Sequence, residues 1–237
     1  MPSPHRPERG PLALSVALVV LGASLLLGCS SGSSGKPKPA ASSDDSKVTV
    51  NDACDHSFDA EGATALRKIA GTSQFQIVLP AEQSTVKQVA NALRSDLNGT
   101  NAQGEHTLCS LDLVGRVNLG LRISYQWFRR SPGDHETVST EESTNFEIAY
   151  GASSHDNGAY LNFSCPLPGS AAAKSRSMEV MASATTFGLD AVNHAQKREA
   201  EARILYSASV KLAAGMGCEG SNLPSALGKL TPLPLKK

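Results

Sequence analysis

The sequence lacks a surplus of charge of either sign. It contains 22 basic and 22 acidic side chains, and no block of lysine and arginine stands out along it. Proteins that bind nucleic acid or an anionic membrane surface through charge carry such blocks, because they must neutralise phosphates. The composition therefore argues against nucleic acid as a partner and against a polybasic membrane patch.

The sequence also lacks the short spacings that hold metal ions. None of its cysteines lies in a CxxC motif or beside a histidine. The histidines beyond residue 28 are widely separated, at His56, His106, His135, His155 and His194. Zinc sites need ligands at short, fixed spacings. We therefore expect no metal site.

Motifs of nucleophilic catalysis and of nucleotide binding are missing as well. Residues 151–155 approach the GxSxG nucleophile elbow only superficially, and we predict a hairpin loop there with Asp156 as a turn former. Residues 215–220 match GxGxxG but end a predicted helix, whereas a dinucleotide site needs the motif to open one. We therefore expect no catalytic residues and no cofactor.

The first 28 residues have the layout of an export signal. Arg6 and Arg9 precede residues 11–28, which contain no charged side chain. A basic start followed by an apolar stretch is typical of a signal peptide. An uncleaved anchor helix is the alternative, since the stretch approaches the roughly 20 residues that span a bilayer. The absence of a twin arginine there favours the general secretion route.

The end of this stretch resembles the bacterial lipobox, through Leu26, Leu27, Gly28 and Cys29. In that motif a branched apolar residue, a small or apolar residue and a Gly or Ala precede an obligatory cysteine. The resemblance implies a diacylglyceryl thioether on Cys29 and cleavage that makes Cys29 the first residue. The protein would then be held in the lipid bilayer of the cell membrane by its acyl chains, on the extracytoplasmic face.

The composition changes after the lipobox. Residues 30–47 hold only Ser, Gly, Lys, Pro, Ala and Asp, which is typical of a flexible linker with a reach of about 20–25 Å. We therefore divide the chain into a signal peptide (1–28), a lipidated cysteine with its linker (29–47) and a single extracytoplasmic domain (48–237). Residues 48–237 are enough for one domain with a sizeable core.

The domain has an even number of cysteines, at Cys54, Cys109, Cys165 and Cys218. An even number in an exported protein predicts disulfides, and four cysteines can pair in three ways. We favour Cys54 with Cys109 and Cys165 with Cys218, because each loop then stays within one half of the domain and joins the edge of a helix to a strand. The chain-entropy model gives roughly 3–4 kcal/mol for each.

Three segments have apolar residues at helical spacing. The first carries Ala63, Leu66 and Ile69, between a cap at Ser57 or Asp59 and an end at Gly71. The second carries Val86, Val89, Ala90, Leu93 and Leu97, and ends at Asn98. The third follows a cap at Asp190, carries Ile204, Leu205, Ala208 and Leu212, and ends at Gly215 and Gly217.

Between the second and third helices the period changes to two, which predicts strands. The alternating stretches are 109–113, 119–127, 146–150, 161–165 and 178–184, and turn formers fill 129–137, 151–158 and 166–169. Helices at both ends and a meander of strands between them predict an α+β fold, with an antiparallel sheet packed on one face by helices.

Two groups of acids are candidates for hydrolytic chemistry: Asp52, Asp55, Asp59 and Glu61 near Cys54, and Glu136, Glu141, Glu142 and Glu147 in the middle of the domain. Paired carboxylates can act as acid and base on a sugar. The simpler interpretation is that these acids cap helices and keep exposed edges soluble.

Three segments, together with the lipobox, resemble a group of small actinobacterial exported lipoproteins: residues 54–59, 65–72 and 213–219. That group has no established activity, so the resemblance supplies no functional residues. We therefore expect a membrane-anchored, non-enzymatic binding or regulatory module, whose partner is an envelope protein or a cell-wall polymer. The alternatives are a cell-wall polymer hydrolase that uses paired carboxylates and a carrier that holds a small apolar ligand between sheet and helices.

Overall fold

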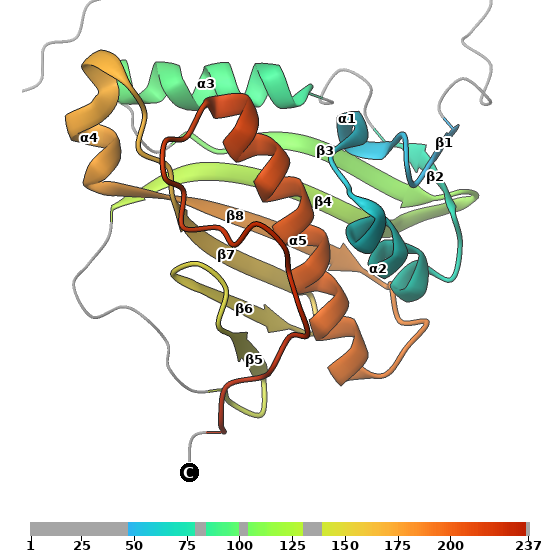
Figure 1. Cartoon of the computed structure of the whole chain (residues 1–237). Helices are drawn as coiled ribbons and strands as arrows, with labels where there is room; N and C mark the ends of the chain where they lie inside the picture. Colours follow the sequence, from blue (N-terminus) through green and yellow to red (C-terminus); the bar gives the residue numbers. More distant parts are fainter. Residues whose placement is uncertain (1–46, 79–83, 100–103, 130–138, 236–237) are drawn as a thin grey trace, which may run out of the picture. The chain divides into compact units, whose positions relative to one another are not determined.

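An eight-stranded antiparallel sheet runs through the domain (Figure 1). The computed structural model describes residues 47–78, 84–99, 104–129 and 139–235. The strand order is β1-β2-β3-β4-β8-β7-β6-β5, and each neighbouring pair is antiparallel. With helices packed on one face, the sheet confirms the α+β fold that the sequence predicts.

The strands alternate apolar and polar side chains as the sequence predicts. On β4, Leu121, Ile123, Tyr125 and Trp127 are buried, whereas Arg122 and Phe128 on the other face are exposed. The strands are β1 (Lys47–Thr49), β2 (Gln74–Ile77), β3 (His106–Leu113), β4 (Arg116–Arg129), β5 (Ser143–Phe146), β6 (Gly151–His155), β7 (Gly158–Ser164) and β8 (Met178–Phe187).

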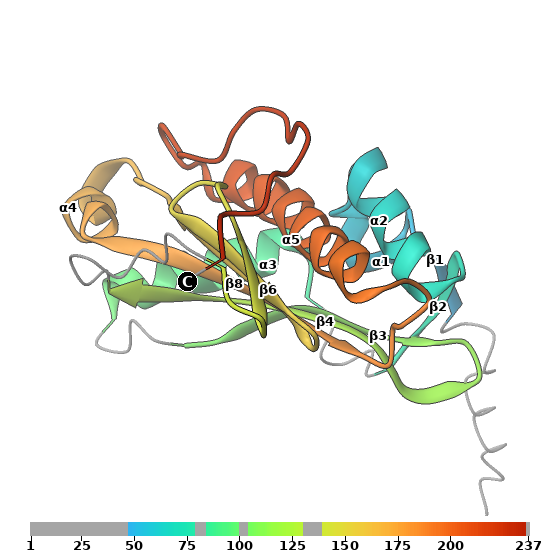
Figure 2. The same ribbon diagram turned by 90° about the horizontal axis from the view of Figure 1, so that it is seen from below.

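Three longer helices pack on the apolar face. Figures 1 and 2 place α5 across the sheet, and it contacts both α2 and α3. None of the described helices lies on the opposite face in Figure 2. The helices are α1 (Ala53–His56), α2 (Ala60–Ala70), α3 (Val86–Asn98), α4 (Ala172–Arg176, after a 3-10 turn at Gly169–Ala171) and α5 (His194–Met216).

Side-chain caps begin both α2 and α3, and for α2 the cap is Asp59, one of the two residues that the sequence offers. The Asp59 side chain accepts a hydrogen bond from the Gly62 amide, and Gly71 ends α2 in the left-handed conformation. Thr85 and Gln88 form a capping box at the start of α3. The contacts at Asp59 and Gly71 explain why both ends of α2 can be read from the residues alone.

The predicted cap of α5 is wrong. Asn193, not Asp190, caps this helix, because its extended backbone lets its side chain accept a hydrogen bond from the Gln196 amide at 3.0 Å. Gly215 lies inside α5, and only Gly217 ends it in the left-handed conformation. Asp190 lies before the helix, where its carboxylate accepts a hydrogen bond from Lys197.

The predicted loop at 151–158 is also wrong. Residues 151–155 form β6, which turns into β7 through Asp156 and Asn157 alone. The predicted strand at 146–150 ends at Phe146, and the chain turns at Ala149, whose φ is +53°. β6 escapes a hydrophobicity pattern because one of its inward side chains is the polar Ser154, which is fully buried.

The core lies between the sheet and the helices. Its largest fully buried side chains include Trp127, Tyr125, Phe75, Phe146 and Phe163. The Trp127 indole N–H donates to the carbonyl oxygen of Leu93 on α3 at 2.7 Å. This bond satisfies the only polar atom of the largest core side chain and fixes α3 against β4.

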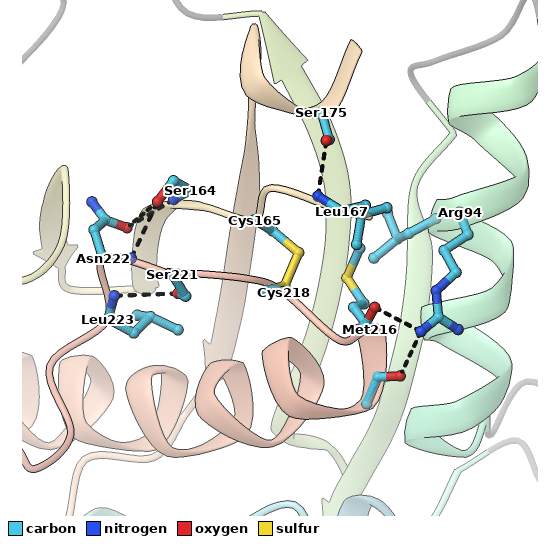
Figure 3. Close-up of a disulfide and its surroundings, with 12 residues drawn as sticks. Arg94, Ser164, Cys165, Leu167, Ser175, Met216, Cys218, Ser221, Asn222 and Leu223 are labelled. Atoms are coloured by element: carbon cyan, nitrogen blue, oxygen red, sulfur yellow. Dashed lines mark hydrogen bonds between the residues drawn. A yellow bond between two sulfur atoms is a disulfide. The ribbon is translucent and has the colours of Figure 1, made fainter. Parts of the chain in front are cut away.

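Two disulfides close the domain, with the pairing that the sequence favours: Cys54 with Cys109 and Cys165 with Cys218. The second joins Cys165, the residue after β7, to Cys218, which follows Gly217 at the C-terminal end of α5 (Figure 3). In the same view, Arg94 of α3 donates to the carbonyl oxygen of Met216 at 2.6 Å. A covalent bond and a charged hydrogen bond therefore hold the end of α5.

The predicted signal peptide, Cys29 and residues 30–46 of the predicted linker lie outside the described residues. Lys47, which the sequence places in the linker, already belongs to β1. Within the described ranges no helix combines the length and the apolar character that crossing a bilayer requires.

Candidate binding site

A cavity at the start of α5 gathers charged side chains of both signs. Its volume is about 470 Å³. The β6–β7 turn, the connection from β8 to α5 and the first turn of α5 form its walls. The lining residues are Asp156, Asn157, Gly188, Asp190, Val192, Asn193, His194 and Lys197.

Lys197 is the buried cation of this cavity. Its side chain is 6 % exposed, and its ammonium nitrogen lies 2.7 Å from Asp190 Oδ1. The Asp190 side chain, in contrast, is 69 % exposed. A buried ammonium needs an anionic partner. Because the Asp190 carboxylate is exposed to solvent, another carboxylate can replace it while Lys197 stays buried.

Asp156 is the centre of a second ion-pair group at the mouth of the cavity. Its Oδ1 accepts hydrogen bonds from Arg198 Nη2 at 2.9 Å and from Nδ1 of His194 at 3.0 Å. The Arg198 guanidinium and the His194 ring hold the pKa of the Asp156 carboxyl below its usual value. Arg198 also donates to the backbone carbonyl of Glu141 at 3.3 Å, which ties the segment before β5 to α5.

Glu201 lies one helical turn after Lys197 and is fully buried. Its carboxyl accepts hydrogen bonds from Ser154 of β6 at 2.6 Å and from Thr186 of β8 at 2.5 Å. Burial raises the pKa of Glu201, and the two hydroxyls and the charge of Lys197 offset part of that rise. The two hydrogen bonds join β6, β8 and α5 next to the cavity wall.

This arrangement suits binding better than nucleophilic catalysis. The hydroxyl of Ser154 is buried and donates to Glu201, so it is not presented to the cavity. The charged groups that do line the cavity, Lys197 with Asp190 and Asp156 with His194, are already paired. A concave site with a few convergent polar groups is the usual form of a small-molecule site.

The first predicted acidic group is divided among structural roles. Asp55 Oδ2 accepts a hydrogen bond from the Val86 amide at 2.8 Å, at the start of α3. Asp59 caps α2, and Glu61 pairs with Arg203 at 2.9 Å. Asp52 accepts a hydrogen bond from the Thr49 hydroxyl at 2.6 Å. The structure therefore gives each of these acids a separate partner.

In the second acidic group, Glu141, Glu142 and Glu147 are exposed, and Glu136 lies outside the described residues.

The histidines are likewise dispersed. His106 pairs with Asp96 at 2.7 Å and His155 contacts the Tyr160 ring. His56 Nδ1 donates to the Asn51 carbonyl oxygen, and His135 falls outside the described ranges. No cluster of three or more His, Cys, Asp or Glu among the described residues could hold a metal ion.

The sequence did not identify Lys197, which lines the cavity, or Glu201, which lies one turn further along α5. Neither is among the residues that the sequence singles out, because both lie in the charged first half of the predicted helix. A signal was nevertheless present, because positions 197, 201, 205, 208 and 212 form one helical stripe and the last three are apolar. Charged residues that continue an apolar stripe are candidates for buried, paired groups.

Two further cavities are lined mainly by polar and charged residues. One, of about 570 Å³, lies between α2 and α5 beside Arg203, which pairs with both Glu61 and Glu199. The other, of about 460 Å³, lies between α3 and the sheet beside His106 and Arg122. Neither is lined by a charged side chain as deeply buried as Lys197, so the cavity at the start of α5 is the strongest candidate.

Comparisons with known proteins give this chain no relative. No protein-family model, no curated protein and no solved structure matches it. The resemblance to actinobacterial lipoproteins therefore stays a prediction, and the functional argument rests on the side chains described above.

Proposed function

We propose that the protein is a lipid-anchored, non-enzymatic binding module on the extracytoplasmic face of the cell membrane. Its ligand is a small molecule that carries both a carboxylate and an ammonium group, bound in the cavity at the start of α5. One observation carries this proposal: the buried ammonium of Lys197 is paired with the solvent-exposed carboxylate of Asp190.

The ligand chemistry follows from the cost of exchanging partners. Lys197 is already out of water, so a ligand carboxylate that replaces Asp190 does not incur a new desolvation of the lysine. The displaced Asp190, or Asp156 across the cavity, is then available to the ligand ammonium. The cavity volume of about 470 Å³ falls within the usual range for small-molecule sites. Amino acids and short peptides of the cell wall carry both groups.

The alternatives have less geometric support. A hydrolase needs two carboxyls that face one substrate bond. Asp55, Asp59 and Glu61 instead serve a helix terminus, a cap and an ion pair. A carrier of apolar ligands needs an apolar cavity, whereas Lys197 and its neighbours line the candidate site with charge.

The ligand class is tested by isothermal titration of the purified mature protein with a dipeptide, its N-acetylated form and its C-amidated form. We expect the free dipeptide to bind and both blocked forms to bind at least tenfold more weakly. Lys197→Met should abolish binding, whereas Lys211→Met, an exposed lysine on the same helix, should leave it unchanged. Equal binding of blocked and free forms, or equal effects of the two variants, would contradict the proposal.

A further inference from the structure

We infer that the end of the sheet at the β3–β4 hairpin rests on the lipid bilayer, with Val114 and Phe187 inserted among the headgroups. This inference depends on the proposed lipid anchor at Cys29. Val114 lies in the hairpin connection and is 39 % exposed, and Phe187 ends β8 and is 49 % exposed. Both are large apolar side chains in contact with water, and burial of each against an apolar surface would be favourable.

The strand register brings these two residues to one end of the sheet. Phe187 pairs with Gly120 of β4, and Gly120 pairs with Asp112 of β3, two residues before Val114. Because Gly120 has no side chain, it does not cover the Phe187 ring. The partly buried Leu119 side chain occupies the space into which a side chain at Gly188, the residue after Phe187, would project.

The chain enters the domain at this same end. Val48 of β1 pairs with Phe75 of β2, and Phe75 pairs with Leu113, the residue before Val114. Figures 1 and 2 both show β1 and the β3–β4 hairpin at the same end of the sheet. If the chain is anchored at Cys29, this end of the sheet is therefore the one held nearest to the membrane.

The predicted linker makes a weak membrane contact sufficient. A segment with the composition predicted for the linker would have a reach of about 20–25 Å between Cys29 and Lys47, which would keep the hairpin end close to the headgroups. Tethering of this kind gives an effective concentration of about millimolar, which favours insertion of the two apolar side chains even where their own affinity for the bilayer is weak. The exposed Arg116 beside Val114 favours a bilayer that contains anionic lipid.

Another exposed aromatic residue provides a matched control. Phe128 is 38 % exposed and lies toward the opposite end of β4, where it pairs with Glu179 of β8. If the hairpin end faces the bilayer, Phe128 stands away from it. If the open face of the sheet instead lay flat on the membrane, Phe128 and Phe187 would enter it together.

The test uses the full lipidated protein in vesicles of phosphatidylcholine and phosphatidylglycerol with brominated acyl chains, which quench tryptophan on contact. The native Trp127 is 1 % exposed in the core and supplies a constant background. We expect Phe187→Trp and Val114→Trp to be quenched at least twofold more than Phe128→Trp. Circular dichroism of each variant checks that the fold is kept.

Equal quenching of the three variants, or no quenching of Phe187→Trp in vesicle-bound protein, would overturn the inference. Protein that does not sediment with the vesicles and carries no acyl mass on Cys29 would refute the proposed anchor itself, and the inference would fall with it. The two failures are therefore distinguishable in one preparation.

Discussion

Lys197 and Glu201 stand one turn apart on α5 and are both buried, although each side chain carries an ionisable group. The lysine pairs with Asp190, and the glutamate accepts hydrogen bonds from Ser154 and Thr186. One residue thus serves the cavity and the other joins the elements that form its wall. The burial of these two groups predicts effects on the stability of the domain and on its pH dependence, which can be measured without a ligand.

The free energy of unfolding of the wild type should fall as pH rises, and Glu201→Gln should remove this pH dependence. Burial raises the pKa of Glu201 in the folded state above its unfolded value of about 4.3, so folding favours the protonated form. The wild type should therefore lose free energy of unfolding as pH rises above about 4.3, until the folded pKa is passed. The amide of the variant is neutral throughout, and the hydroxyls of Ser154 and Thr186 can donate to it or accept from it.

Urea unfolding between pH 4 and pH 8, with the disulfides intact, measures this effect. We expect the difference between Glu201→Gln and the wild type to shift in favour of the variant as pH rises. A difference that does not depend on pH would show that Glu201 has the same pKa in the folded and unfolded chains.

Removing either partner of the Lys197–Asp190 pair should have unequal effects on stability. Asp190→Asn leaves the buried ammonium without its carboxylate and should cost about 1–3 kcal/mol. Lys197→Met removes the buried charge together with its need for a partner, so it should cost less. Thermal unfolding of both variants at pH 7 compares them, and an equal or larger cost for Lys197→Met would contradict the asymmetric burial of the pair.

The disulfide between Cys165 and Cys218 should contribute about 4 kcal/mol to the free energy of unfolding, because it closes a loop with a sequence separation of 53 residues. Replacing both cysteines with alanine should lower the unfolding midpoint without loss of secondary structure, since Arg94 still holds the end of α5 through Gly215 and Met216. Denaturant unfolding with circular dichroism measures both quantities. An unchanged midpoint would mean that these hydrogen bonds alone fix α5.

Cys29→Ser should release the protein from the membrane fraction. The lipobox resemblance predicts a mature chain that begins at Cys29 with a thioether-linked lipid, and the variant has no sulfur for that bond. Fractionation of cells and intact mass of the purified protein give the result. Membrane retention of the variant with residues 1–28 still attached would instead support the uncleaved anchor helix.

Much of the fold follows from local chemistry. Asp59 and Gly71 mark both ends of α2, and the apolar stripe from Val86 to Leu97 marks α3. The alternation of Ile123, Tyr125 and Trp127 on β4 identifies one face of the sheet. These elements are predictable because the residues that define them are neighbours in sequence.

The site could not be predicted in the same way, because it depends on partners distant in sequence. Ser154 lies in a stretch typical of a loop, and only its contact with Glu201, 47 residues away, explains why it is buried in a strand. Asp190 resembles a helix cap, and its actual role depends on the burial of Lys197. Polar groups buried in pairs disrupt the hydrophobic pattern on which sequence reasoning relies.

Binding of a zwitterionic ligand at the start of α5 can be measured by a nuclear magnetic resonance titration of the isotope-labelled mature protein with a free dipeptide. We expect saturable shifts concentrated at Asp156, Asp190, His194 and Lys197, and at least tenfold weaker binding of the N-acetylated dipeptide. Shifts centred on Arg203 between α2 and α5, or no saturable shifts at millimolar dipeptide, would contradict binding at this site.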